Sequence, residues 1–232
     1  MSKDIPIIFS APMVRALLEG RKTMTRRIIK PQPVPFMIDE KPCDVGSMQI
    51  DGDPRARVTL GRVITKQELR YAVGDRLWVR ENLCRGEFLG IKQNVSVTRY
   101  SADEAEVLNE DGFNLLPWWK GKGGLPSIHM PRSASRLTLI VTGLKIERLR
   151  DISEADVLAE GVVRFKSGDT EMFGIRIPGA YEHPGLTPRE TFQNLWCTLH
   201  GPHAWNDNPF VVAISYRVIK ANIDAPEARL AA

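Results

Sequence analysis

Residues 20–27, GRKTMTRR, follow a segment that carries the local signals of a short helix. Ser10 suits the position before a helix, and Pro12 suits its first turn, where a backbone N–H has no partner to lose. Apolar residues then recur at helical spacing. Gly20 suits the left-handed backbone that often ends a helix. The sequence therefore predicts a helix over residues 11–19, and the segment 20–27 begins where this helix ends.

The segment 20–27 lies in a dense group of positive charges. Residues 15–30 hold six lysine and arginine residues against one glutamate, which leaves a local excess of five positive charges. The whole chain has a net charge of +4 and a pI of about 9.0. Such a cluster suits phosphate groups or a nucleic acid. Charge alone, however, favours a basic face that is simply solvated.

Elsewhere, short or alternating apolar runs predict strands, and the alternation is clearest from Phe210 to Val218. The expected strands cover residues 5–9, 77–80, 137–141, 146–149 and 210–218. Two further helices carry caps: Ser153 precedes the first, which is predicted to end at Glu160 with Gly161 behind it. Residues 187–190, TPRE, form a capping box for the second. The apolar face of this last helix is expected to contain Phe192, Leu195, Trp196 and Leu199.

Three stretches rich in proline, glycine and polar residues separate the predicted elements, namely residues 31–72, 84–127 and 162–185. We interpret them as loop-rich insertions, the first with at most short strands, and residues 221–232 as a frayed C-terminal tail. The expected architecture is a single α+β domain over residues 1–220. It is mostly β, with a barrel-like sheet and short helices packed outside it.

The composition narrows the class of protein further. The chain has 232 residues, of which 43% are apolar, and no apolar run is long enough to cross a bilayer. Its first residues lack the pattern of a signal peptide. Three well-separated cysteines, without partners at zinc spacing, predict neither a disulfide framework nor a metal site. We therefore expect a cytoplasmic protein with no membrane association, no cofactor and no metal, while the oligomeric state stays open.

The pair Lys22 and Thr25 indicates one kind of chemistry. A lysine amine can act as the base for a threonine hydroxyl when part of the lysine is neutral. The neighbouring cations Arg21, Arg26 and Arg27 lower the pKa of such a lysine by repulsion, and burial adds to the effect. The same cations could instead hold a phosphate. A lysine and a threonine three residues apart also arise by chance, so the spacing alone decides nothing.

Residues 20–27 contain the pattern GxKxxTxR, which resembles the signature of ASCH domains in the PUA-like superfamily. As in that family, the pattern follows a short N-terminal helix. Residues 74–79, GDRLWV, look like the GD turn and strand of the family, and residues 210–219 look like its closing strand. Residues 78–81 and 126–132 also resemble longer ASCH proteins encoded by phages and prophages.

The resemblance implies a PUA-like β-barrel with a cleft beside the loop of residues 20–27, in a superfamily that binds RNA or modified bases. A small bacterial relative is an amidohydrolase that removes the acyl group from N4-acetylcytidine with a lysine, a threonine and a glutamate. Carried over, Lys22 is expected to be the general base, Thr25 the nucleophile, and Glu160 the residue that orients the amide or shuttles a proton. Arg27 is expected to stabilise the cleft or the developing oxyanion.

The resemblance identifies the glutamate of the site less closely than it identifies Lys22 and Thr25. Glu160 lies at the end of a predicted helix, where the family places a helix whose glutamate faces the cleft. This correspondence rests on the order of the helices and not on a sequence motif. Glu154 and Glu81 therefore remain alternatives for the acid.

Further residues are expected to contact a substrate or a nucleic acid. They are Gly20, Arg21, Arg26, Arg27, Arg80, Glu81, His129 and Arg132. For Arg80 and Glu81 the alternative is a strand-end salt bridge, which contributes only about 0–1 kcal/mol when it is exposed. For His129 and Arg132 the alternative is a loop that hydrogen bonds tie to the rest of the domain.

Three functions remain open from the sequence. The first is a metal-free hydrolase of acylated or otherwise modified pyrimidine nucleosides. The second is a non-catalytic module that binds RNA or modified DNA bases, with RNA as the favoured partner and the basic residues on its phosphates. The third is a metal-independent ribonuclease, in which basic groups stabilise a phosphorane-like transition state. A shared fold does not select among these functions.

Overall fold

The structure of the chain is a computed structural model. It describes residues 2–230 except 31, 33–35, 39–40, 44–47, 51–68, 90–93, 110, 115–116, 118 and 120–122. The chain groups into two compact units: unit 1 comprises residues 1–20, 75–140 and 218–232, and unit 2 comprises residues 21–74 and 141–217. Two strands, β10 (Thr138–Arg148) and β14 (Phe210–Ile219), each contribute residues to both units. The single domain over residues 1–220 stays a prediction.

The sheet of unit 1 begins with β1 (Asp4–Ile8), which pairs in parallel with β6 (Arg76–Arg80). On its other side, β6 pairs antiparallel with the first residues of β10. The helix predicted after β1 is α1 (Ala11–Leu18), and the side chains of its Val14 and Leu17 are fully buried. The structure confirms the strand, the helix and the left-handed residue that follows.

Residues 83–125 are more regular than the loop-rich insertion expected over 84–127. They contain a three-stranded antiparallel sheet in the order β8-β7-β9. Its strands are β7 (Leu83–Leu89), β8 (Asn94–Tyr100) and β9 (Gly124–Leu125). Gly86 weakens the strand signal of β7, yet it has a packing role, because a Cβ there would lie 2.7 Å from Cδ of Arg99 on the paired strand.

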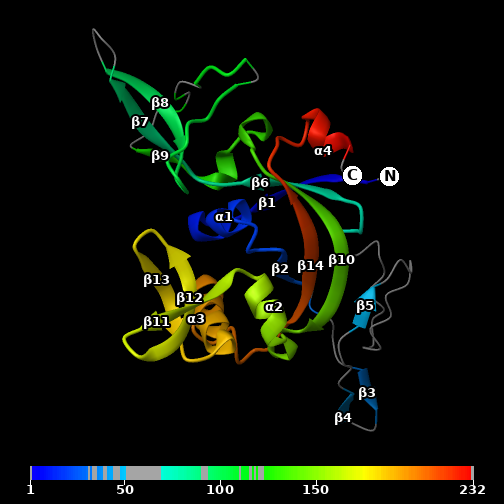
Figure 1. Cartoon of the computed structure of the whole chain (residues 1–232). Helices are drawn as coiled ribbons and strands as arrows, with labels where there is room; N and C mark the ends of the chain where they lie inside the picture. The colour runs from blue at the N-terminus through cyan, green and yellow to red at the C-terminus, as the bar shows by residue number, and fades with distance from the viewer. Residues whose placement is uncertain are drawn as a thin grey trace. The chain divides into compact units, whose positions relative to one another are not determined.

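The end of the chain packs onto unit 1, so the frayed tail expected over 221–232 is wrong for the described residues. Helix α4 (Pro226–Leu230) follows Ile223, and the side chain of Ile223 is fully buried. The guanidinium of Arg132 contacts Asp224 at 2.7 Å and Asp4 at 2.6 Å. These ion pairs join both ends of the chain, which lie side by side in Figure 1.

The sheet of unit 2 has the strand order β10-β14-β2, with β2 (Met24–Ile28) at its edge. The predicted strands 137–141 and 146–149 are one continuous strand, β10. The strand predicted over 210–218 is confirmed as β14. Short strands occur in the insertion expected over 31–72, much of which lies outside the described residues. They are β3 (Phe36–Ile38), β4 (Lys41–Cys43) and β5 (Met48–Ile50).

The loop-rich stretch expected over 162–185 is a three-stranded antiparallel sheet instead. Its strands are β11 (Val162–Ser167), β12 (Thr170–Ile177) and β13 (Ala180–Gly185), and Figure 1 shows them beside α3 (Pro188–His200). The rings of Phe165 and Tyr181 stack at 3.8 Å, and both pack against Gly174 in the middle strand. This glycine weakens the sequence pattern of β12, while its missing side chain makes room for the aromatic pair.

The two capped helices of unit 2 form as the sequence predicts. The Ser153 hydroxyl accepts the backbone N–H of Asp156 at the start of α2 (Glu154–Ala159), and the Thr187 hydroxyl caps α3 in the same way. Between β10 and α2 lies the short 3-10 helix η3 (Leu149–Asp151). On the apolar face of α3, Phe192, Leu195 and Trp196 are buried, whereas Leu199, near the end of the helix, is 55% exposed.

The fold is therefore mixed α+β and mostly β. None of the sheets formed by the described residues closes into a barrel. Within the part of the chain that the structure describes, no helix combines the length and the apolar character that a membrane span requires.

Candidate functional site

The loop that follows Gly20 is held between two elements of unit 2. The backbone N–H of Thr23 donates to the carbonyl of Ala159 at the end of α2, at 2.9 Å. The carbonyl of Thr23 accepts the backbone N–H of Tyr216 in β14, at 3.0 Å. Because both hydrogen bonds use the main chain, they fix the backbone from which Lys22 projects.

Lys22 is fully buried, and its ammonium group contacts Glu160 twice. Nζ donates to Oε2 of the carboxylate at 2.6 Å and to the backbone carbonyl of the same residue at 2.8 Å. Glu160 directly follows α2, and the positive φ of Gly161 (103°) turns the chain away behind it. Since Ser153 also caps the start of α2, the short helix is fixed at both ends and holds the carboxylate against Lys22.

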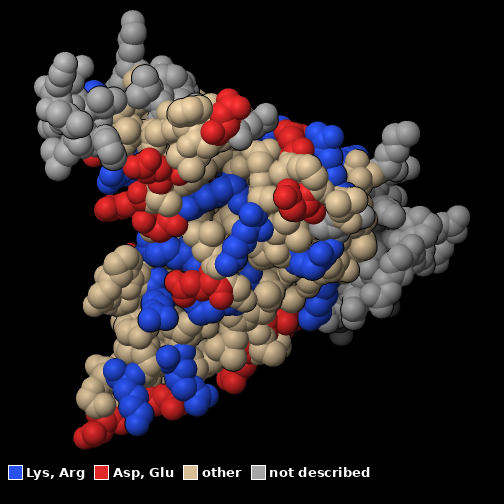
Figure 2. Space-filling model, turned by 45° about the horizontal axis from the view of Figure 1, so that its top comes forward, with Lys and Arg blue, Asp and Glu red and all other residues tan. Residues whose placement is uncertain are grey.

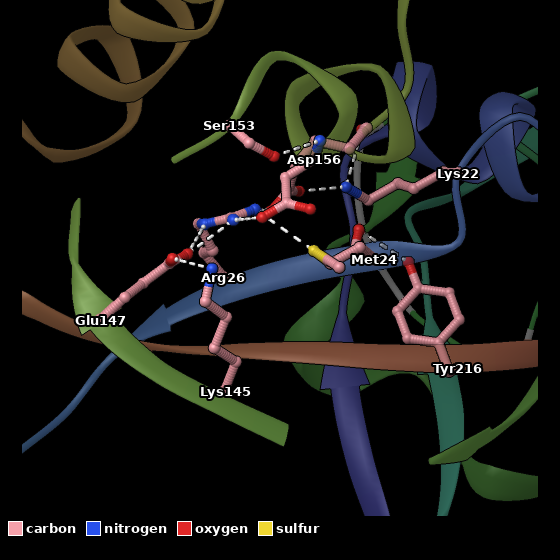
Figure 3. A network of polar contacts seen from close by, with 9 residues as sticks. Lys22, Met24, Arg26, Lys145, Glu147, Ser153, Asp156 and Tyr216 are labelled. Carbon is pink, nitrogen blue, oxygen red and sulfur yellow. Dashed lines mark hydrogen bonds and ion pairs between the residues drawn. The ribbon is translucent and has the colours of Figure 1, made fainter. Parts of the chain in front are cut away.

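Arg26 extends this pair into a network of ion pairs (Figure 3). Its guanidinium contacts Glu160 Oε1 at 3.2 Å, Asp156 Oδ2 at 2.6 Å and Glu147 Oε1 at 2.6 Å. The Glu160 carboxylate therefore bridges the two cations, with Oε2 on Lys22 and Oε1 on Arg26. The carboxylate of Glu147 is shared in the same way, because its Oε2 lies 2.8 Å from Nζ of Lys145.

The network joins three cations to three carboxylates, and most of it is inaccessible to water. The side chains of Lys22, Arg26 and Glu147 have no exposed surface, and that of Glu160 is 4% exposed. Removing charges from water costs several kcal/mol per ion, so such a cluster is a weak source of stability. Ionisable groups whose pKa values are shifted by burial and by a specific charged partner cluster at functional sites. The network is therefore a candidate site.

Burial lowers the pKa of Lys22 below its ordinary value, because a charged amine loses its hydration there. The nearby cations Arg27 and Arg26 act in the same direction, whereas the Glu160 carboxylate opposes them by stabilising the ammonium. Burial also raises the pKa of Tyr216, whose phenol donates to the backbone carbonyl of Met24 at 3.2 Å. Burial and the neighbouring cations therefore favour the neutral amine of Lys22, whereas the contact with Glu160 favours the charged one.

Thr25 lies in β2 and is 2% exposed. It pairs with Ile214 of β14, and Arg27 pairs with Val212. Because side chains alternate along a strand, Thr25 and Arg27 share one face of β2, and Arg26 points to the other. The Lys22 amine, in contrast, donates its two hydrogen bonds described above to Glu160, which also contacts Arg26.

A pocket of about 390 Å³ opens in unit 2 on the face of β2 that carries Arg27. Residues that follow β2, the segment 69–71 and the last residue of α3 surround it. Its lining consists of Arg27, Ile28, Ile29, Lys30, Leu69, Arg70, Tyr71, His200 and Val212. Arg27 therefore connects the GxKxxTxR segment to a cavity of ligand size.

Of the remaining residues predicted for the site, three arginines have local partners and His129 is exposed. In unit 2, Arg21 donates to the backbone carbonyl of Gly161 at 3.1 Å, and Arg26 is enclosed in its carboxylate network. In unit 1, Arg80 donates to the carbonyl of Ile128. His129 is exposed at the end of the 3-10 helix η1 (Ser127–His129).

Glu160 is the one of the three candidate acids that contacts Lys22. Glu154, at the start of α2, is exposed. Glu81 lies in unit 1, where the guanidinium of Arg136 binds its carboxylate with two hydrogen bonds of 2.9 Å. The strand-end ion pair expected there involves Arg136 and not Arg80. Arg132 lies in unit 1 as well, with its ion pairs to the two chain ends; it begins the 3-10 helix η2 (Arg132–Ala134).

Sequence reasoning missed two of the three carboxylates around Arg26. Glu147 sits in the predicted strand 146–149, where a buried acid within an apolar run was the available signal. Asp156 gives its backbone N–H to the Ser153 cap, and its carboxylate binds Arg26. Among the described residues, no group of three or more histidine, cysteine or acidic side chains is arranged to hold a metal ion.

Charge on the visible surface is mixed. On the face drawn in Figure 2, acidic side chains interrupt the lysine and arginine side chains. This arrangement differs from a continuous basic track along which a nucleic-acid backbone could lie. Comparison with protein-family models, with curated proteins and with solved structures found no match for this chain.

Proposed function

We propose that unit 2 holds the active site of a metal-free amidohydrolase that removes an acyl group from N4-acetylcytidine or a similarly acylated pyrimidine nucleoside. One observation carries the proposal: the buried Nζ of Lys22 lies 2.6 Å from the carboxylate of Glu160, in the segment that resembles the ASCH signature. The resemblance names a lysine, a threonine and a glutamate, and the lysine and the glutamate meet although 138 residues separate them. The PUA-like fold is part of the same proposal.

The reaction follows from the roles of these groups. Neutral Lys22 takes the proton of the Thr25 hydroxyl, whose oxygen attacks the acyl carbonyl carbon. Arg27, on the same face of β2 as Thr25, stabilises the oxyanion that develops. The protonated lysine then gives its proton to the departing N4 amine, which leaves cytidine and an acyl ester on Thr25. A water molecule then gives a proton to Lys22 and attacks the ester carbonyl carbon. The bond to the Thr25 oxygen breaks, Lys22 returns the proton to that oxygen, and the carboxylic acid leaves.

Glu160 acts on Lys22 in this scheme. It fixes the direction of the amine through two hydrogen bonds, and it accepts or returns a proton as the lysine changes its charge. The proposal requires the Lys22 amine to reach the Thr25 hydroxyl when the substrate is bound.

The test is to incubate the purified protein with N4-acetylcytidine and an excess of chelator and to measure cytidine by chromatography. Wild type is expected to release cytidine, and Lys22→Met and Thr25→Val are expected to lose turnover. Mass spectrometry of the peptide that contains Thr25 should reveal the acyl ester in a rapidly quenched reaction. Arg164→Gln, an exposed position in the same unit, serves as the control that keeps full activity. If folded wild-type protein releases no cytidine, the proposal is wrong, and nucleic-acid binding or RNA cleavage takes its place.

A further inference from the structure

Apart from Arg27, the residues that line the pocket beside β2 have no role in the proposed chemistry. Four of its lining residues carry basic groups: Arg27, Lys30, Arg70 and His200. The others are aliphatic apart from Tyr71, and no carboxylate is among the described residues that line it.

The basic groups act on a common region of the pocket. His200, at the end of α3, has a pKa below its ordinary value because of burial first and then the positive charges of Arg27 and Lys30. The positive charges of Arg27 and Lys30, at the β2 end of the pocket, therefore act on His200, although His200 belongs to a helix far along the chain. Arg70 lines the same cavity from a third segment. A single anion in the cavity can be attracted by all of them.

The other residues that line the pocket indicate which kind of molecule carries the anion. Tyr71 is 6% exposed and Leu69 is also 6% exposed, and with Ile29 and Val212 they form an apolar wall. A volume of about 390 Å³ is in the range of pockets that enclose small organic ligands. Arginine suits phosphate because its planar group can bind two oxygens at once. A ligand with a phosphate at one end and a flat or apolar part at the other fits these walls.

We propose that this pocket binds the phosphate group of a nucleotide. The inference deepens the proposed function, on which it rests for the identity of the base: the substrate becomes an acylated cytidine that carries a phosphate. Arg27 lines this pocket and shares one face of β2 with Thr25, so a nucleotide held in the pocket lies near the proposed nucleophile. Lys30 and Arg70 then serve the phosphate, while Arg27 serves the oxyanion. The phosphate is the common feature of a free mononucleotide and of a residue within RNA.

Calorimetric binding to the wild-type chain tests the proposal, with cytidine 5′-monophosphate, cytidine, inorganic phosphate and a short cytidine oligoribonucleotide as probes. We expect the monophosphate to bind about tenfold more tightly than cytidine, and this preference to weaken as salt rises. Lys30→Gln and Arg70→Gln remove charges from exposed side chains, and each should reduce the preference while leaving the affinity for cytidine unchanged. Lys166→Gln removes the same charge from an exposed residue of β11 that does not line the pocket, and should have no effect.

The outcomes separate this inference from the proposed function. Equal or undetectable affinity for the monophosphate and cytidine overturns the pocket assignment, as does a preference that survives both substitutions. Tighter binding of the oligoribonucleotide than of the monophosphate assigns the phosphate to RNA, and the reverse assigns it to a free nucleotide. If Lys30→Gln loses the phosphate preference but the wild-type protein never releases cytidine, the pocket assignment is supported and the hydrolase is rejected. Release of cytidine by a protein that shows no phosphate preference supports the hydrolase and rejects the pocket assignment.

Discussion

Glu160 holds Lys22 with both its side chain and its main chain. The carboxylate and the backbone carbonyl of one residue accept two hydrogen bonds from the same ammonium group, at 2.6 and 2.8 Å. A change of the Glu160 side chain therefore removes the charge that stabilises the ammonium but keeps one of its hydrogen-bond partners. This makes it possible to separate the electrostatic role of Glu160 from its role in positioning.

The first prediction concerns the pH dependence of deacylation. Neutral Lys22 is the active base, so the rate should rise with pH and level off above the pKa of Lys22, which burial holds below its ordinary value. Glu160→Gln removes the negative charge that raises this pKa. The rising part of the curve should therefore move to lower pH in the variant, which profiles of kcat/KM for both proteins will measure. A shift to higher pH, or an unchanged profile, contradicts the assignment of Lys22 as the base.

The second prediction concerns the stability of the buried network. Arg26→Met leaves three carboxylates without their shared cation, and we expect the free energy of unfolding to fall by about 3–5 kcal/mol. Arg164 also forms an ion pair, with Glu171, but both side chains are more than half exposed. Arg164→Met should therefore cost only about 0–1 kcal/mol. Urea unfolding at neutral pH measures both values, and similar small losses would mean that water reaches the network around Arg26.

Much of the fold could be predicted because its signals are local. The caps of α2 and α3, the end of α1 and the alternation in β14 each depend on residues close together in the sequence. The sheet β11-β12-β13 was missed because Gly174 interrupts the pattern of its central strand. The role of that glycine becomes visible only when Phe165 and Tyr181 are seen to pack against it from the two neighbouring strands.

The candidate site was predictable only in part, for a related reason. The meeting of Lys22 with Glu160 followed from the family resemblance and the order of the helices, since the residues themselves are 138 positions apart. Arg26 contacts Glu147 across 121 positions, and no local pattern marks that pair. As a result the sequence indicated that Arg26 binds a substrate, whereas the structure shows its guanidinium surrounded by carboxylates. The pocket was missed because its cations come from segments that only the fold brings together.

The third prediction uses His200 as a probe of the pocket. Its pKa should lie below 6.5, because Arg27 and Lys30 disfavour a third positive charge and burial removes hydration. Lys30→Gln removes one repelling charge, so the pKa of His200 should rise. Binding of cytidine 5′-monophosphate adds negative charge to the same cavity and should raise it further. Titration of the imidazole signals by NMR measures each change, with His200→Gln to assign the signal. If the pKa of His200 changes neither in Lys30→Gln nor on binding of cytidine 5′-monophosphate, the shared pocket is contradicted.

The fourth prediction separates the backbone role of Gly20 from general strain. Gly20 has a φ of 73°, and a Cβ there would meet nothing within 4 Å, so Gly20→Ala costs stability only through its backbone conformation, by about 1–2 kcal/mol. Gly20→Asn should cost less, because asparagine tolerates the left-handed region better. Gly168, with a φ of 61° and equally open surroundings in the turn between β11 and β12, is the matched control. Both alanine variants should lose similar stability in urea unfolding, but only Gly20→Ala should lower kcat/KM for deacylation, because Gly20 sets the direction of the loop that carries Lys22. Equal kcat/KM values in the two variants would show that the loop that carries Lys22 keeps its backbone conformation without Gly20.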